Sequence, residues 1–256
     1  MSMTWSAIVL AGSRPGGDPL AAKFGTKLKA LIPIAGEPMV RRPVAALLGS
    51  GDVGRIIVVS QSPKHISGAL PEDARVEVRQ SQWTIAETIE KLIIGRVADF
   101  PLLVTTADHA LLDGEMIAEF IAGAEGADVA IGVVERQSLA ARLPQSKRTW
   151  LAFRGGAYSG ANLFALGSMK SLAALEQWRS VEQDRKKGWR VLLALGPALL
   201  LGAVLRLRTI EQSVAAMGRR LGMTARVVVL SNPLACVDVD KPIDHALVEA
   251  ILAGRA

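Results

Sequence analysis

Short apolar runs alternate along the chain with longer segments in which apolar residues recur every three to four positions. Runs such as RIIVVS at 55–60 and PLLVTT at 101–106 have the length and β-branched content of buried strands. The longer segments have helical periodicity. The predicted strands are 5–10, 55–60, 75–78, 101–106, 128–134, 161–166 and 226–230. One predicted helix opens at Gly36-Glu37-Pro38, and the others cover 84–97, 113–121, 168–187, 211–221 and 242–252.

Strands that alternate with helices of this length predict an α/β fold with three layers, α/β/α, around a mostly parallel, Rossmann-like sheet. In such sheets the ligand lies beyond the carboxyl ends of the strands. We therefore expect the functional residues in the loops after Leu10, Ser60, Thr106 and Leu230.

Composition narrows the range of partners. Half of the 256 residues are apolar, which provides a core for a single domain covering 1–256. The net charge of +6 favours anionic partners, but aromatic residues are only 4% of the chain, so we expect no nucleic-acid partner. One cysteine excludes an internal disulfide. The N-terminus lacks the pattern of a signal peptide, which predicts a cytoplasmic protein.

One apolar segment complicates the cytoplasmic assignment. Residues 191–205 are uncharged and mostly apolar, and Arg190 and Arg206 flank them. A membrane-spanning helix needs about 20 such residues, and a Gly-Pro pair interrupts this segment. We interpret the segment as a buried helical hairpin within an apolar helical insert at about 168–222. Weak contact with a membrane surface, with the arginines facing acidic head groups, is the alternative.

The loop after the first predicted strand has a composition suited to phosphate binding. Gly12, Gly16 and Gly17 would let backbone amides approach a phosphate, and Arg14 and Lys29 would neutralise its charge. The loop matches neither the Walker pattern nor the dinucleotide fingerprint. From composition alone, a flexible surface loop is an equally good interpretation.

Aspartates follow two predicted strands. Asp108 leaves the apolar run PLLVTT, and Asp238 and Asp240, two residues apart, would share one face if their segment were a strand. Mg²⁺ is usually held by one or two carboxylates together with substrate phosphates. Solvated or helix-capping carboxylates remain the alternative. His109 and His245 lack zinc-ligand spacing, so we expect no zinc site.

Five stretches in this order carry a family resemblance: "IVLAGSRPGG", "KALIPIAGEPMV", "TTADHALL", "YSGANLFAL" and "DVDKPIDHAL". They resemble the motifs of molybdenum-cofactor-guanylyltransferase-like nucleotidyltransferases, a branch of the nucleotide-diphospho-sugar transferase superfamily. The resemblance covers most of the chain. It implies a GT-A-like fold with a mixed, mostly parallel sheet.

The resemblance also implies roles for individual residues. Lys29 and Arg14 would be catalytic, and Asp108 and Asp240 would bind Mg²⁺, or Mn²⁺ in its place, with Asp238 as an outer partner. The implied nucleotide-binding residues are Leu10, Ala11, Gly12, Ser13, Gly16, Gly17, Gln80 and Ser81. The implied acceptor-binding residues are Gly160, Asn162, Arg148 and Arg154.

Two residues near the implied nucleotide site have alternative interpretations. Ser81 or Thr84 could instead be the N-cap of the following helix. Trp83 could stack on a base, but we expect it to pack in the core.

The implied activity is transfer of a nucleoside monophosphate from CTP, GTP or UTP to a phosphorylated small-molecule acceptor, with release of pyrophosphate. A nucleotide-sugar-dependent glycosyltransferase is one alternative, although Asp108-His109-Ala110 lacks the D-x-D pattern common in those enzymes. A non-catalytic nucleotide-binding or peripheral membrane protein is the other alternative.

Overall fold

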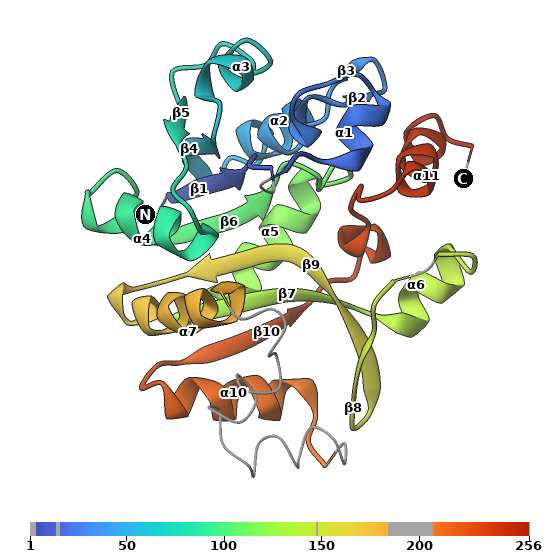
Figure 1. Ribbon diagram of the computed structural model, residues 1–256. Helices are drawn as coiled ribbons and strands as arrows, with labels where there is room; N and C mark the ends of the chain where they lie inside the picture. The colour runs from blue at the N-terminus through green and yellow to red at the C-terminus, as the bar shows by residue number, and fades with distance from the viewer. Residues whose placement is uncertain (1–3, 14–15, 147, 184–206, 256) are drawn as a thin grey trace.

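The computed structural model describes residues 4–13, 16–146, 148–183 and 207–255 (Figure 1). Its main element is an eight-stranded sheet with the order β10-β7-β9-β6-β1-β4-β5, in which β8 pairs with β9. The strands are β1 (Trp5–Leu10), β4 (Val53–Ser60), β5 (Val76–Gln80), β6 (Leu102–Thr106), β7 (Val129–Glu135), β8 (Leu151–Phe153), β9 (Gly156–Leu166) and β10 (Ala225–Val229).

The sheet is mixed because a single long strand runs against its neighbours. Strand β1 is parallel to β4 and β6, β4 is parallel to β5, and β7 is parallel to β10. Strand β9 is antiparallel to both β6 and β7, and it joins the two parallel halves. The predicted three-layer fold with a mixed, mostly parallel sheet is confirmed.

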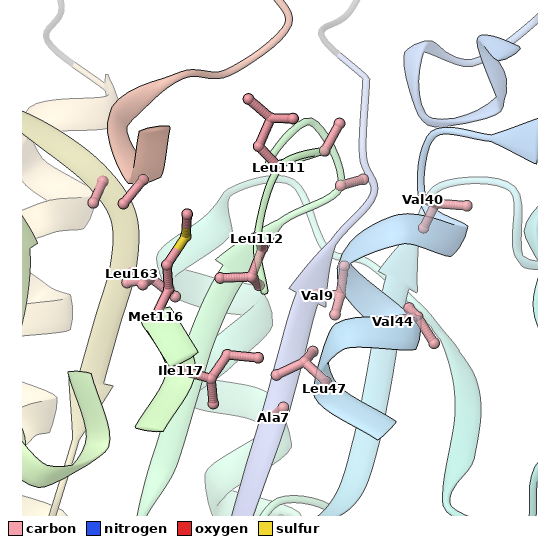
Figure 2. Close-up of a cluster of buried hydrophobic side chains, with 14 of the residues drawn as sticks. Ala7, Val9, Val40, Val44, Leu47, Leu111, Leu112, Met116, Ile117 and Leu163 are labelled. Carbon is pink, nitrogen blue, oxygen red and sulfur yellow. The ribbon is translucent and has the colours of Figure 1, made fainter. Parts of the chain in front are cut away.

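Alternate residues of the central strands face two separate cores. Figure 2 shows Ala7 and Val9 of β1 facing Val44 and Leu47 of α2, with Ile117 of α5 beside them. The second core, on the other face of the sheet, is covered by α4 and α7. The helices are α1 (Pro19–Lys23), α2 (Arg41–Gly49), α3 (Pro63–Ser67), α4 (Ile85–Ile94), α5 (Gly114–Ala124), α6 (Arg136–Arg142), α7 (Leu172–Gln183), α10 (Ile210–Arg220) and α11 (Pro242–Leu252).

The prediction that a helix opens at Gly36-Glu37-Pro38 is wrong. Strands β2 (Pro33–Ile34) and β3 (Glu37–Pro38) form a small antiparallel hairpin there, and α2 begins only at Arg41. Ala35 and Gly36, with φ of 52° and 81°, make the two-residue turn. Two successive positive φ angles are the geometry of a tight hairpin, which a proline-based helix rule does not anticipate.

Other differences concern the lengths of elements. Strand β9 begins at Gly156, well before the predicted start, and the predicted helix 168–187 divides into a short 3₁₀ turn at Met169–Ser171 and then α7. The apolar segment 191–205 lies outside the described residues, so the insert and the single-domain organisation stay predictions. Within the described residues, no helix is long and apolar enough to cross a membrane.

The register of the parallel strands brings their carboxyl ends to one edge. Leu10 is level with Val59 of β4 and with Thr106 of β6, and Ser60 is level with Gln80. The loops that follow β1, β4, β5 and β6 therefore leave the sheet side by side, as the ligand-site rule for α/β folds requires.

Candidate active site

A lysine and two aspartates from distant parts of the sequence meet at this edge. Lys29 Nζ lies 2.6 Å from Asp108 Oδ2 and 2.5 Å from Asp240 Oδ1. The side chains of Lys29 and Asp108 are 14% and 19% exposed, and that of Asp240 is 56% exposed. Two predicted metal ligands and a predicted catalytic residue thus form one cluster that opens to solvent on the Asp240 side.

Asp108 is held firmly at the end of β6. Thr106 Oγ1 donates a hydrogen bond to Asp108 Oδ1 over 2.5 Å, and the Val239 amide donates to the Asp108 carbonyl oxygen over 3.2 Å. The second bond attaches the chain just before Asp240 to the end of β6. One short backbone contact therefore brings the two carboxylates together.

Lys29 begins a 3₁₀ turn, Lys29–Leu31, in the long loop after β1. Helix α11, which follows Asp240 directly, also fixes this loop. His245 Nε2 is 2.8 Å from the Pro33 carbonyl oxygen, and its ring centroid is 4.4 Å from that of Phe24. The helix thus holds the loop that carries the lysine and the segment that carries Asp240 in one arrangement.

The electrostatics of the cluster favour a charged lysine. Burial opposes the charge on Lys29, but the Asp108 and Asp240 carboxylates outweigh it, and the pKa of the ammonium is raised above its usual value. The ammonium therefore acts as a permanent cation between two carboxylates.

Asp238 belongs to a second, adjacent pair. Arg148 Nη1 lies 2.5 Å from its Oδ1, and Asn162 Nδ2 donates to its Oδ2 over 3.1 Å. Burial raises the pKa of Asp238, but Arg148 and Asn162 outweigh burial and hold that pKa below its usual value. Arg148 and Asn162, both predicted to bind the acceptor, therefore contact Asp238, the aspartate next to the cluster.

The expectation that Asp238 and Asp240 share one face of a strand is wrong, because residues 237–240 are not in a strand. Asp238 pairs with Arg148, and Asp240 pairs with Lys29. Because each of the two carboxylates is neutralised by a different cation, the two aspartates can lie two residues apart in the sequence.

The loops after β1, β4 and β5 meet through amide side chains. The Ser13 amide donates to Gln61 Oε1 over 2.9 Å, and Gln61 Nε2 donates to the Ser13 carbonyl over 3.0 Å. Gln80 Nε2 in turn donates to the Gln61 carbonyl over 3.1 Å. The hydroxyls of Ser13 and Ser81 are buried without a hydrogen-bond partner among the described residues. Both residues belong to the predicted nucleotide-binding set.

Gln61 is a site residue that the sequence reasoning missed. It directly follows Ser60, the last residue of β4, so its place at the carboxyl edge of the sheet was the available signal. No motif identifies it, because only the structure shows that its amide makes both hydrogen bonds to Ser13.

The remaining predicted nucleotide-binding residues lie along the same edge. Leu10 ends β1, and Ala11 is buried, with its amide donating to the Val59 carbonyl over 2.9 Å. Gly12 follows, and an added Cβ there would lie 3.0 Å from the Gln61 side chain. The two further glycines, Gly16 and Gly17, have positive φ angles of 93° and 87°.

Some predicted site residues lie elsewhere. Arg154 is at the turn between β8 and β9, where its amide donates to the Arg208 carbonyl and its guanidinium contacts Gln212 of α10. Gly160 lies on β9, two residues before Asn162. Arg14 is outside the described residues. The structure thus brings Arg148 and Asn162, but not Arg154, to the carboxylate cluster.

Two further expectations near the site have clear outcomes. Thr84, not Ser81, is the N-cap of α4, since its side chain accepts from the Glu87 amide. The expectation that Trp83 packs in the core is wrong, because the residue is 95% exposed. The loop 80–84 turns this ring away from both cores of the sheet.

His109 and Cys236 line the buried side of the site. Burial lowers the pKa of His109 to about 4 and raises that of Cys236 to about 11, so both are neutral at neutral pH. Among the described residues, no three or more His, Cys, Asp or Glu side chains converge as metal ligands. The Asp108 and Asp240 pair supplies two hard oxygen ligands, which suits Mg²⁺ that keeps its other positions for water and phosphate.

Residues 7–199 match the model of the MobA-like NTP transferase domain family. The chain belongs to this family. This NTP transferase domain is similar to a hypothetical transferase from Thermus thermophilus, with 30% identity and a TM-score of 0.80 over 95% of this chain and 100% of that one. Comparison with curated protein sequences finds no match.

Two more distant structures share the fold of this NTP transferase domain. The 4-diphosphocytidyl-2C-methyl-D-erythritol synthase of Anaerococcus prevotii is 11% identical, with a TM-score of 0.62 over 98% of this chain and 97% of its own. CMP:2-keto-3-deoxy-manno-octonic acid synthetase complexed with CTP is 12% identical, with a TM-score of 0.59 over 99% and 100%. Family and fold together make the chain a nucleotidyltransferase.

Proposed function

We propose that this NTP transferase domain moves a nucleoside monophosphate from CTP, GTP or UTP to a phosphorylated small-molecule acceptor, in a reaction that requires Mg²⁺. The observation that carries the proposal is the convergence of Lys29, Asp108 and Asp240 at the carboxyl edge of the sheet. Mn²⁺ is expected to replace Mg²⁺, because both accept carboxylate and phosphate oxygens.

The nucleotide is proposed to lie across the loops after β1, β4 and β5. Gly16 and Gly17 adopt left-handed φ angles that leave their amides free to approach a triphosphate. The base would lie near Gln80 and the unpartnered Ser81 hydroxyl, whose donor and acceptor groups suit the edge of a nucleobase. Arg14, in the same loop, would add a positive charge beside the phosphates.

The proposed reaction needs no general base. An oxygen of the acceptor phosphate, already ionised at neutral pH, attacks the α-phosphorus, and the bond from that phosphorus to the bridging oxygen breaks to release pyrophosphate. Bound Mg²⁺ supplies positive charge to the phosphate oxygens. Lys29 neutralises the charge that develops on the leaving group, and the surrounding loops align the two reactants.

The acceptor is proposed to bind beside Asp238. Arg148 and Asn162 offer donors there, while the Asp238 carboxylate accepts hydrogen bonds. Gly160, on the same strand as Asn162, leaves space without a side chain, and Arg154 is the remaining acceptor-binding candidate. We place the reaction in the cytoplasm, where nucleoside triphosphates are abundant.

The test combines a donor panel with two matched substitutions. Pyrophosphate release is measured with CTP, GTP, UTP and ATP, each with a mixture of sugar phosphates and phospho-alcohols, with and without Mg²⁺. We expect one nucleotide to stand out only with Mg²⁺, and D108N and D240N to lose at least about 10²-fold in rate, as charge contacts of this kind do.

The control is D99N, which changes an exposed carboxylate before β6, at the opposite end of that strand from Asp108. It should keep the wild-type rate. Wild-type turnover by D108N would remove Asp108 from the site. Absence of pyrophosphate release with every donor and acceptor would overturn the proposed reaction.

A further inference from the structure

The Lys29 ammonium occupies the space between the two carboxylates that a divalent cation would need. Its Nζ is within 2.6 Å of one oxygen of Asp108 and 2.5 Å of one oxygen of Asp240. Mg²⁺ binds carboxylate oxygens at about 2.0–2.1 Å. An ion bound by both of these oxygens would lie within a few ångströms of the ammonium, where two positive charges repel strongly.

We propose that Lys29 is an exchangeable internal cation of this site. Without nucleotide, its ammonium neutralises Asp108 and Asp240 and excludes a divalent ion from them. When the triphosphate binds, its negative charge attracts the ammonium, and the divalent ion takes the vacated place between the carboxylates. The metal therefore binds together with the nucleotide and not before it. This inference rests on the proposed function, since it assigns a binding order to the same nucleotide and metal.

The site is built so that the lysine, and not the aspartate, moves in this exchange. Asp108 is restrained by the Thr106 hydroxyl and through the Val239 amide. Lys29 has a four-carbon side chain that can redirect its ammonium without moving the 3₁₀ turn that carries it. Asp240 is 56% exposed, which gives an incoming hydrated ion a route to the carboxylate pair.

The loop that carries Lys29 also carries the glycines proposed to hold the anion that would attract the ammonium. Lys29 and the glycines Gly16 and Gly17 belong to the same connection after β1, and both glycines have left-handed φ angles suited to a phosphate. A triphosphate on this loop would therefore compete for the ammonium with the carboxylates. The exchange needs only a rotation of one side chain.

The experiment measures Mn²⁺ binding by electron paramagnetic resonance, with the full chain and no nucleotide. We expect K29M to bind Mn²⁺ at least about tenfold more tightly than the wild type, because the competing unit charge is gone. K29R, which keeps the charge, should bind as weakly as the wild type.

The control K27M removes an exposed lysine of the same loop, and it should leave Mn²⁺ binding unchanged. Adding D108N to K29M should abolish the gain.

Wild-type and K29M proteins with equal Mn²⁺ affinity would overturn the inference while leaving the proposed function intact. A gain in K29M that survives D108N would also overturn it, because the ion would then bind elsewhere. If K29M does not fold, K29Q replaces it with the same expected gain. A non-hydrolysable triphosphate should raise the Mn²⁺ affinity of the wild type. If the triphosphate itself does not bind to any variant, the proposed function fails instead.

Discussion

At the scale of single residues, the candidate site is assembled from side chains that are far apart in the sequence. Lys29 is 79 residues from Asp108 and 211 residues from Asp240, yet all three share one cluster of ionic hydrogen bonds. Asp108 and Asp240 share the Lys29 ammonium, and the neighbouring Asp238 is paired with Arg148. This arrangement stabilises a concentration of carboxylates that would otherwise repel one another.

Trp83 allows a test of the proposed nucleotide position. Its ring is 95% exposed and lies three residues after Gln80, at the carboxyl edge where we place the base. We expect the ring to stack on the nucleobase. Stacking of this kind contributes about 1–3 kcal/mol per base, so W83L should weaken nucleotide binding by about fivefold or more. Because the ring contacts little of the protein, thermal stability should stay the same.

The matched variant is W83F, which keeps an aromatic face and should retain most of the affinity. The affinity of each variant for the nucleotide that the donor panel identifies is measured by isothermal titration calorimetry. Equal affinities of W83L and the wild type would show that Trp83 makes no contact with the base.

At the scale of elements, contacts at the two ends of the sheet have different tasks. At the carboxyl edge, α11 fixes the loop of Lys29 through His245 and leads directly from Asp240. At the opposite edge, Asp128 lies just before the start of β7 and forms hydrogen bonds near the end of β9 and the start of β10. It accepts hydrogen bonds from the Ser168 hydroxyl over 2.5 Å and from the amide and hydroxyl of Thr224 over 2.8 Å each. The contacts at the carboxyl edge position the candidate site, and the contacts of Asp128 at the opposite edge stabilise the sheet.

The hydrogen bonds to Asp128 predict a pH-dependent stability. The Ser168 hydroxyl, together with the amide and hydroxyl of Thr224, lowers the pKa of Asp128 to about 2. A carboxyl whose folded pKa is depressed stabilises the folded state above its unfolded pKa of about 3.9, and this contribution disappears as the pH falls through the folded value. Because solvent screens this partly exposed carboxylate, D128N should lower the free energy of unfolding by no more than about 1 kcal/mol at pH 6, and by progressively less between pH 4 and about 2.

Urea denaturation of D128N and the wild type across this pH range measures the difference. The exposed carboxylate variant D99N serves as the control, with no expected change at any of these pH values. If D128N lowered the free energy of unfolding by the same amount from pH 6 to pH 2, the ionised Asp128 carboxylate would not be the source of the stabilisation.

At the scale of the whole molecule, the sheet determines where ligands bind and the net charge determines which ligands are attracted. The chain carries 30 Lys and Arg against 24 Asp and Glu. This excess favours a triphosphate and a phosphorylated acceptor at a common edge, where several loops converge. The single long antiparallel strand β9 connects β6, β1, β4 and β5 to β7 and β10, and it places Asn162 beside Asp238.

The apolar segment 191–205 is best tested on the intact chain. Because we interpret it as a buried helical hairpin, we expect the protein to stay at the bottom of a density gradient with vesicles rich in phosphatidylserine. The measurement is flotation, repeated with neutral vesicles. Flotation with the acidic vesicles alone, lost in R190E and R206E, would instead establish the membrane-surface alternative.

Sequence reasoning succeeded where apolar periodicity within one element carried the signal. The runs RIIVVS and PLLVTT are strands, and residues 242–252 form a helix with the predicted bounds. These features follow from the periodicity of apolar side chains within one element. The motifs that carried the family resemblance also gave Lys29, Asp108 and Asp240 their predicted roles, and the structure places these three side chains together.

The sequence by itself therefore determined the fold class, the family and the candidate charges of the site. Only the tertiary structure decided how these charges pair, because pairing depends on strand register and on contacts such as that of the Val239 amide with Asp108. It also decided the tight turn at Gly36, the exposure of Trp83 and the role of Gln61. The exposure of Trp83 and the role of Gln61 depend on neighbours distant in sequence, and the turn at Gly36 depends on positive φ angles; a periodic pattern of apolar residues encodes neither.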